Sequence, residues 1–354
     1  MIKWILRSLA IILTVVFLVL LFNKITGNQE AEFLKLNTGI EPQFIENVTE
    51  RTWLDYELEK VPLENDLSDS LFNPMLVKNF NDTLYVVDYA DMKIKRFTKN
   101  GKFINQYGKN IGRGPEDFNQ ITDISITDEK IYAVDANTFK TKVLSKQTGE
   151  AYKPISYKHH VSRVLALPKH STITLGISTN LFRLYDANDS LRMEFGELTN
   201  DQMKNMLSFG GILLESSNPS EFMYLSSYAS FIFFYNTKGE NTKTFQTIDR
   251  LDFPKSTVSE TGVRAPSPPL MLQGAALNNE HLFLQYTRKS MKDHENPLFH
   301  QMHSFIDVYS DDGKSYFGSF TLTQRTRGIT VINDALYAIN YNTSKVEGFK
   351  LLRF

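Results

Sequence analysis

A short strand motif that recurs along the chain constrains its fold more than any other feature of the sequence. Three segments align without a gap, at Asn81–Asp88, Asp128–Asp135 and Asn333–Asn340. Each begins with a polar turn, continues as aliphatic-Tyr-x-aliphatic, ends on an acid or amide, and has a lysine five residues further on. Asn and Asp favour chain reversal, and a strand that is apolar on both faces must be covered on both faces. The motif therefore predicts sheets that stack against one another.

Weaker copies of the motif fill the interval between the second and third segments. Taking one anchor per copy places anchors at residues 84, 131, 173, 222, 282 and 336, with successive anchors 42 to 60 residues apart. A four-stranded propeller blade has a pitch of about 40–45 residues, and loop insertions lengthen it. We therefore expect an all-β chain, a six-bladed β-propeller. A solenoid or two β-sandwiches would also give strands at such spacing, but the steps are too long for hexapeptide β-helices, and the Cys-Trp-Cys pattern of antibody-like domains is absent.

The two ends of the predicted ring complement each other. The last copy offers three strands, at 329–332, 336–340 and 346–351, whereas one strand-like segment at 53–61 has no partner of its own. Pairing the two would remove an open sheet edge. We expect the N-terminal strand near 53–61 to close the last blade, in a propeller that spans residues 49–354.

An apolar segment precedes the repeats. Its apolar run is Leu9–Phe22, which Lys3 and Arg7 flank on the N-terminal side. With the upstream Ile5 and Leu6, the stretch from 5 to 22 is just long enough to cross about 30 Å of hydrocarbon. It predicts a single-pass transmembrane signal-anchor within residues 1–27, followed by a polar tether over 28–48. The basic flank orients the N-terminus inward, so the propeller would lie outside the cytoplasm. A cleaved signal peptide is the alternative, although no Ala-x-Ala site follows the apolar segment.

Composition excludes several classes of site. The chain contains no cysteine, which removes disulfides, thiolate metal sites, cysteine nucleophiles and lipoprotein acylation. The formal net charge is -1, so no global field attracts nucleic acid, and we expect no nucleic-acid partner.

The first copy resembles an NHL-type repeat. The matching residues are Val87-Asp88, Ile94, Phe97, Gly101, Phe103 and Tyr107-Gly108, and they are followed by Gly112–Phe118, which resembles the Gly-x-Gly-Pro-x-x-Phe linker between NHL blades. The chain is thus similar to bacterial extracytoplasmic six-bladed propellers of the NHL-repeat and TolB-like group. The resemblance implies a bacterial cytoplasmic membrane protein with its propeller on the periplasmic side. Members of this group are often binding or scaffold modules, and some related propellers are enzymes.

The linker supplies one candidate ligand contact. Arg113 could present a guanidinium to an anionic ligand at the mouth of the ring, or it could pair with Glu116 or Asp117 and only fix the turn. We interpret Gly112, Gly114 and Pro115 as structural turn residues, because glycine allows positive φ and proline fixes the turn.

Three further residues are candidate contacts. Asp88 and Asp135 end equivalent strands, where carboxylates could contact a ligand or hold Ca²⁺, or could simply cap their own turns. Arg264 lies in a Pro-rich segment, 254–272, that we interpret as a long surface loop for partner contacts. The histidines at 294, 300 and 303 could bind a metal ion. We instead expect a hairpin with scattered histidines, because residues three apart on an extended strand point to opposite faces. We predict no metal site and no cofactor.

No nucleophile elbow or phosphate loop occurs in the sequence. We therefore expect a binding or scaffold module, with an unknown protein or small ligand held at the mouth of the propeller. A metal-dependent hydrolase or lyase with its site in the central channel is the alternative, and a purely structural subunit of an envelope complex is a third.

Overall fold

The computed structural model describes residues 33–351, apart from positions 38, 46–47, 49, 55–57, 65–66, 68, 168–170, 177, 260–261, 265–269 and 289–302. Of residues 257–259, 262–264, 270 and 288 it describes the backbone alone. Residues 34–354 form one compact unit, and only Phe33 is described of the unit before it. The transmembrane helix predicted within residues 1–27 lies outside the described residues. Among those described, no helix is long and apolar enough to cross a membrane.

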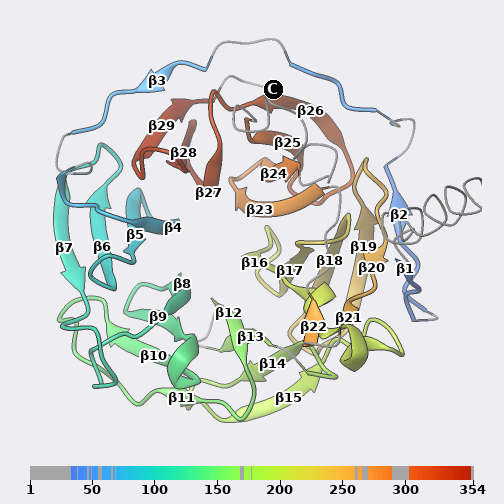
Figure 1. Cartoon of the computed structure of the whole chain (residues 1–354), viewed down its shortest axis with the longest axis horizontal. Helices are drawn as coiled ribbons and strands as arrows, with labels where there is room; N and C mark the ends of the chain where they lie inside the picture. The colour runs from blue at the N-terminus through green and yellow to red at the C-terminus, as the bar shows by residue number, and fades with distance from the viewer. Residues whose placement is uncertain are drawn as a thin grey trace, which may run out of the picture. The chain divides into compact units, whose positions relative to one another are not determined.

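Six antiparallel sheets, the blades, are arranged around a central opening (Figure 1). Blade 1 contains β4 (Pro74–Phe80), β5 (Thr83–Asp88), β6 (Lys93–Thr98) and β7 (Phe103–Tyr107). Blade 2 contains β8 (Ile121–Ile126), β9 (Lys130–Asp135), β10 (Lys140–Ser145) and β11 (Ile155–Ser156). Blade 3 contains β12 (Val161–Ala166), β13 (Thr172–Gly176), β14 (Phe182–Tyr185) and β15 (Leu191–Phe195). Blade 4 contains β16 (Gly211–Glu215), β17 (Glu221–Ser226), β18 (Phe231–Asn236) and β19 (Asn241–Gln246). Blade 5 contains β23 (Leu270–Leu277), β24 (His281–Arg288), β25 (Phe305–Ser310) and β26 (Tyr316–Thr321). Blade 6 contains β27 (Thr326–Ile332), β28 (Ala335–Asn340), β29 (Val346–Lys350) and β3 (Lys60–Val61).

The six-bladed propeller predicted from the repeat is confirmed. All six sequence anchors lie in the second strand of a blade. The first strands contact one another in the order β4, β8, β12, β16, β23 and β27, and β27 returns to β4. Strand β2 (Gln43–Phe44) adds a fifth, outermost strand to the sheet of blade 4. Short elements outside the blades are β1 (Phe33–Leu34), β20 (Phe253–Pro254), β21 (Thr257–Ser259), β22 (Gly262–Arg264) and the 3-10 helices η1 (Ala136–Thr138) and η3 (Gln202–Phe209).

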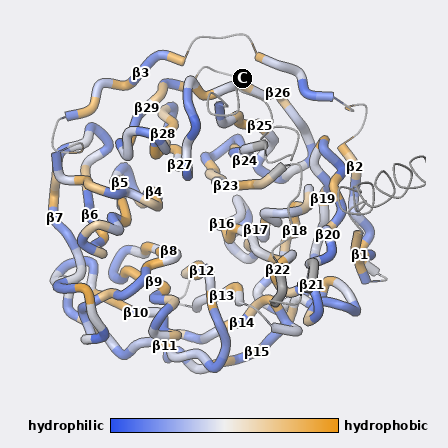
Figure 2. Tube along the Cα trace, viewed as in Figure 1, coloured by the Kyte–Doolittle hydropathy of each residue, from blue (hydrophilic) through white to orange (hydrophobic). Residues whose placement is uncertain are grey.

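Side-chain alternation in the second strands explains why the sheets stack. In β5, Leu84 and Val86 pack with Ile339 of blade 6, whereas Tyr85 and Val87 pack on the opposite face against blade 2. Successive strand residues point to opposite faces, so an unbroken apolar strand serves two interfaces at once. Hydrophobic positions are accordingly spread over all six blades rather than gathered on one side (Figure 2).

The N-terminal segment 43–64, which we call the belt, runs along the outer rim of the ring (Figure 1). Its strand β2 pairs in parallel with β19 of blade 4, and Trp53 forms a bridge with Ser319 of blade 5. Strand β3 then pairs antiparallel with β29 of blade 6, and the backbone N–H of Glu64 donates to Asn100 in blade 1. The belt therefore connects the edges of four consecutive blades.

The last blade takes its fourth strand from the expected range 53–61, although that strand is shorter than the range. Only Lys60–Val61 pair with β29, while Trp53 pairs with blade 5 and residues 55–57 lie outside the described residues. The polar tether expected over 28–48 is, in its described part, packed on the propeller, because Leu34 and Ile45 are buried between blades. Isolated apolar residues in a polar segment are enough to anchor it when each enters a seam between sheets.

A buried ion pair fastens the centre of the belt. The Arg51 guanidinium donates to Asp307 of β25, at 3.0 and 2.9 Å, and to Asp249 in the connection after β19, at 2.8 Å from Nη1. It also lies over the Phe305 ring, with 4.6 Å from Cζ to the ring centroid. The Asp307 side chain is fully buried, and Arg51 is 13% exposed. Removing Arg51 would leave the buried Asp307 carboxylate without its counter-ion.

Replacing Arg51 with Met should lower the free energy of unfolding by about 3–5 kcal/mol, the range for breaking a buried ion pair. Chemical denaturation of the full chain measures the change. Lys60→Met is the matched control, because Lys60 is 65% exposed and pairs only loosely with Glu347, at 3.5 Å. A loss no larger for Arg51→Met than for Lys60→Met would show that the guanidinium does not fasten the belt.

The stability of the protein should also depend on the protonation of Asp307. Burial raises the pKa of Asp307 from its ordinary 3.8 to about 6, against the opposing effect of Arg51. Between these values the native state binds more protons than the unfolded state, so the contribution of this carboxyl to stability falls as the pH rises from about 4 to about 6. Wild type should therefore lose stability relative to Asp307→Asn over this range in urea unfolding. Parallel pH profiles of the two proteins would contradict this assignment.

Candidate functional site

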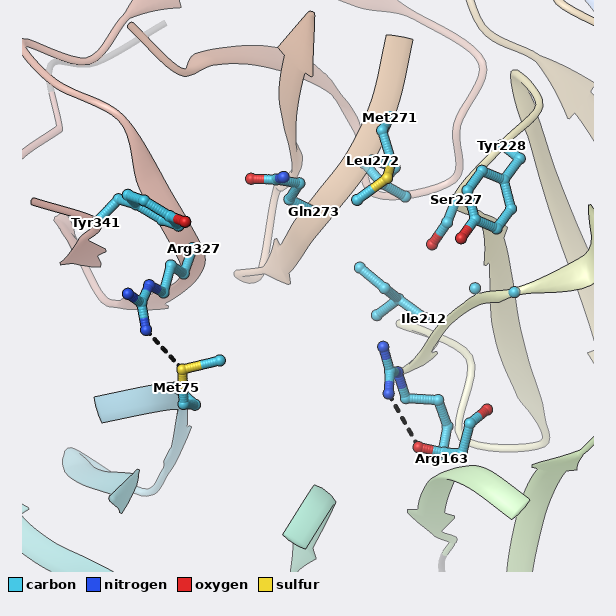
Figure 3. Close-up of a pocket in the computed structure, with 13 residues that line it drawn as sticks. Met75, Arg163, Ile212, Ser227, Tyr228, Met271, Leu272, Gln273, Arg327 and Tyr341 are labelled. Atoms are coloured by element: carbon cyan, nitrogen blue, oxygen red, sulfur yellow. Dashed lines mark hydrogen bonds between the residues drawn. The ribbon is translucent and has the colours of Figure 1, made fainter. Parts of the chain in front are cut away.

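A cavity of about 480 Å³ opens at one end of the central channel (Figure 3). Five blades contribute to its wall, which consists of Met75, Ser162, Arg163, Gly210, Gly211, Ile212, Ser227, Tyr228, Met271, Leu272, Gln273, Arg327 and Tyr341. This volume falls in the range of small-molecule sites. The wall contains two arginines and no acidic residue.

Strand direction places these residues at one end of the ring, which we call the mouth. Met75, Arg163 and Arg327 lie in the first half of the innermost strands β4, β12 and β27. Tyr228 and Tyr341 follow the second strands β17 and β28. Because the first and second strands of a blade are antiparallel, the start of one and the end of the other meet at the same edge. The mouth is thus built by innermost strands and by the turns after second strands.

Arg327 is held at the mouth by blades 1 and 6. Its Nη1 donates to Asn73 Oδ1 at 3.3 Å and lies 2.6 Å from Met75 Sδ. Tyr341 lies between two guanidinium groups, with 4.5 Å from its ring centroid to Cζ of Arg327 and 4.4 Å to Cζ of Arg325. Cation–π contact of this kind orients a guanidinium without neutralising it.

Arg163 extends from blade 3 toward blade 2. Its Nη1 donates to its neighbour Ser162 at 2.9 Å and to the carbonyl of Thr122 in β8 at 3.3 Å. Within the described part of the chain, neither Arg163 nor Arg327 forms an ion pair with a carboxylate. Both positive charges therefore remain available to an anion.

The linker residue Arg113 is placed elsewhere. It is exposed in the connection from β7 to β8 and does not line the cavity. The pairing proposed for it is not formed in the described structure, because Glu116 pairs with Lys109 and Asp117 accepts from the backbone N–H of Asn110.

The turn residues Gly112, Gly114 and Pro115 lie in the same connection, but for a different physical reason than positive φ. A Cβ on Gly114 would lie 2.4 Å from the Asp117 carboxylate, and one on Gly112 would lie 3.1 Å from it, while neither glycine is among those with positive φ. Lys142 Nζ then donates to the carbonyl of Gly114 at 2.8 Å and to that of Asp117. The glycines permit the linker to fold closely over Asp117.

Asp88 and Asp135 lie buried at equivalent places in blades 1 and 2. Asp88 accepts from the backbone N–H groups of Phe72 and Asn73, and Asp135 accepts from those of Asn119 and Gln120, the same distance back along the chain. Neither lines the cavity.

Each of these carboxylates also faces a buried lysine seven residues later. Lys95 Nζ lies 2.8 Å from Asp88, and Lys142 Nζ lies 3.4 Å from Asp135. Burial alone would raise the pKa of Asp88, but Lys95 and three backbone N–H groups outweigh it and hold the pKa below its usual value. In the described residues no group of three or more His, Asp or Glu side chains could hold a metal ion.

The Pro-rich segment 254–272 is not a simple loop. It contains the hairpin of β21 and β22, and its last residues, Leu270–Leu272, already belong to the innermost strand of blade 5. The backbone of Arg264 ends β22, and its side chain lies outside the described part, as do His294 and His300.

The sequence did not single out Arg163 and Arg327, although a signal was present. Arg327 stands thirteen residues before Asn340, Arg163 thirteen before Gly176, and Met75 thirteen before Asp88. Aligning the blades on the end of the second strand would have placed both arginines at one channel-facing position. Without that alignment, Arg163 and Arg327 are two isolated arginines that form no recognisable motif.

Comparison with known proteins agrees with the fold. Residues 45–159 match a family model, DUF5128, described as a 6-bladed beta-propeller. No curated protein matches the chain.

Solved structures with similar folds share little sequence with this chain. A Bacteroides fragilis protein described as exported has 12% identity and a TM-score of 0.57, over 84% of this chain and 95% of its own. A member of the DUF4221 family from Bacteroides vulgatus has 9% identity and a TM-score of 0.56, over 83% and 97%. The Cps50 (Swd1) β-propeller domain of Myceliophteria thermophila has 11% identity and a TM-score of 0.52, over 84% and 99%. At these identities the likeness shows the fold alone.

Replacing Lys142 with Met should destabilise the protein by about 3–5 kcal/mol, because Asp135 would remain buried without its cation. Thermal and urea unfolding of the full chain measure this loss. Lys109→Met is the control, since Lys109 pairs with Glu116 in the same linker but is 72% exposed, and it should leave stability unchanged. Equal effects of the two substitutions would contradict a structural role for Lys142.

Proposed function

We propose that this chain is an extracytoplasmic binding module that holds an anionic ligand at the mouth of its propeller. One observation carries the proposal: Arg163 and Arg327 face a single cavity whose wall contains no acid. Guanidinium groups bind carboxylate and phosphate through paired N–H groups in a fixed fork.

The other polar groups of the wall support binding rather than chemistry. Gln273, Ser227 and Tyr228 offer an amide and hydroxyls that can donate to an anion. The Oε1 atom of Gln273 already accepts from Thr287 at 2.9 Å, which turns its amide nitrogen toward other partners. An anion between the arginines would therefore meet donors on several blades.

The location outside the cytoplasm is part of the same proposal. The apolar segment and its basic flank support a single-pass anchor within residues 1–27, and one structural neighbour is described as exported. The resemblance to the NHL-repeat and TolB-like group supports a periplasmic module, and it stays a prediction.

Isothermal titration of the full chain with citrate and with inorganic phosphate tests the proposal. Hydrogen bonds to charged groups contribute roughly 1.5–3 kcal/mol, so Arg163→Gln and Arg327→Gln should each weaken binding by about 10- to 100-fold. Arg192→Gln is the matched control, because Arg192 pairs with Asp186 and is 65% exposed on the outermost strand of blade 3.

Two results would overturn the proposal. One is the absence of binding of both anions to the wild type at tens of millimolar. The other is binding that both cavity variants leave unchanged. Arg113→Gln, measured alongside, separates this site from the linker arginine, since only a ligand contacting the linker would respond to it.

A further inference from the structure

The N-terminal segment joins the propeller at the mouth end of the ring. Leu34 is buried between blades 3 and 4, and the backbone N–H of Asn37 donates to the carbonyl of Leu198 at 2.8 Å. Leu198 follows the outermost strand β15, whose last residues lie at the mouth end because neighbouring strands of a blade alternate in direction. The chain before Leu34 therefore leaves the propeller on the side where the cavity opens.

The proposed membrane anchor lies close to this point along the chain. It falls within residues 1–27, so residues 28–33 are all that separate it from Leu34. Even a fully extended chain would span at most about 25 Å over this interval. A bilayer at the opposite end of the ring would require the segment to extend past the full height of a blade, about 20 Å for six strand residues. The short interval therefore favours a bilayer at the mouth face or at the rim beside blades 3 and 4.

The mouth face, the end of the ring on which the cavity opens, carries exposed apolar side chains. Phe72, just before β4, is 69% exposed, and Ile111, in the connection from β7 to β8, is 62% exposed; these are the largest values among the large hydrophobic residues that the structure describes. Phe139 follows the second strand of blade 2, and Tyr341 follows that of blade 6. Blades 6, 1 and 2 are consecutive in the ring (Figure 1), across from the point where the N-terminal segment leaves. Apolar contacts and the anchor would thus hold opposite sides of one face.

Phe139 has a backbone conformation that its packing does not explain. Its φ is +54°, in the left-handed region that bulky residues rarely adopt. Its side chain is nevertheless 49% exposed, so burial in the core does not offset the cost. Backbone strain of this kind concentrates at functional surfaces. The strained turn keeps an aromatic ring accessible on the mouth face.

Basic side chains accompany these apolar residues. Arg113 lies in the same connection as Ile111, and Lys158 follows Tyr157, whose backbone N–H donates to the carbonyl of Phe139 at 3.0 Å. Arg113 and Lys158 are exposed, and neither forms an ion pair with a carboxylate among the residues that the structure describes. A membrane surface that contains anionic lipid attracts such residues. The mouth face therefore combines the two kinds of side chain that bind a bilayer surface.

We propose that the mouth face lies against the membrane surface, with Phe72, Ile111 and Phe139 among the lipid head groups and Arg113 and Lys158 over anionic lipid. This inference rests on the part of the proposed function that anchors the chain within residues 1–27. It adds the face that meets the bilayer, and it directs the cavity toward the membrane. The rim beside blades 3 and 4 would satisfy the short interval equally, but it would leave these side chains in water.

Fluorescence quenching of single labels tests the inference. The chain contains no cysteine, so one introduced cysteine can carry a label in the full chain, reconstituted in nanodiscs of phosphatidylcholine and phosphatidylglycerol. Lipids with a spin-labelled head group should quench labels at Ile111→Cys and Phe139→Cys several-fold more than the two controls. The controls are Tyr152→Cys, at the opposite end after β10, and Leu191→Cys, on the outermost strand of blade 3. Both control positions are exposed to a similar extent.

A charge substitution tests the contact with anionic lipid. With the label at Ile111→Cys, Lys158→Gln should shift the equilibrium away from the membrane by about fivefold, the factor for one basic residue at an anionic surface. Lys153→Gln is the matched control, because Lys153 is exposed at the opposite end of blade 2, and it should leave quenching unchanged. Nanodiscs of phosphatidylcholine alone should abolish the effect of Lys158→Gln.

The contrary outcomes separate this inference from the proposed function. Stronger quenching at Leu191→Cys than at Ile111→Cys would place the rim at the bilayer, and equal quenching at all four positions would show that no face is held there; either result would overturn the inference. Dissociation of the full chain from the nanodiscs would overturn the anchor and this inference together. Citrate titration of the same variants reports on the cavity alone, because none of the substituted residues lines its wall.

Discussion

Sheets that are apolar on both faces can persist in water only when each has a neighbour on either side, so the ring has to close. The belt contributes to this closure from outside. Ile45 enters the seam between blades 4 and 5, Leu54 and Leu58 enter the seam between 5 and 6, and Leu63 enters the seam between 6 and 1. Closure also fixes the channel, because the innermost strands that carry Arg163 and Arg327 are oriented only by the blades beside them.

Buried charges serve two different purposes in this ring. Asp88 and Asp135 are local devices, each binding backbone N–H groups just before its own blade and a lysine on the next strand. Asp307 is a long-range device, since its cation, Arg51, comes from a distant part of the sequence. The pairs of Asp88 with Lys95 and of Asp135 with Lys142 hold the turn that leads into each blade. The pair of Asp307 with Arg51 instead holds the belt against blade 5.

Much of the fold could be predicted from sequence because its signal is local. Within eight residues, a second strand and the turn before it show a polar turn, apolar residues that point alternately to two interfaces, and a terminal acid or amide. The number of blades could therefore be counted from the spacing of this motif. Closure of the last blade by the segment near 53–61 was predicted, but the rest of the belt could not be, because its anchors are single apolar residues in polar sequence. The cavity was missed for a similar reason: Arg163 and Arg327 are isolated on innermost strands, while the linker around Arg113 carries the conspicuous motif.

The order in which the chain is synthesised gives the belt a particular role in folding. Its residues leave the ribosome before any blade exists, yet the strand that β3 pairs with, β29, is among the last described elements of the chain. Pairings of such large sequence separation form late and slowly. Until β29 emerges, the belt has no place on blade 6, and the edges of blades 5 and 6 are open to other chains. A newly made molecule therefore passes through an unsealed ring, and the early segment at β3 can join blade 6 only after the late strand β29 has been made.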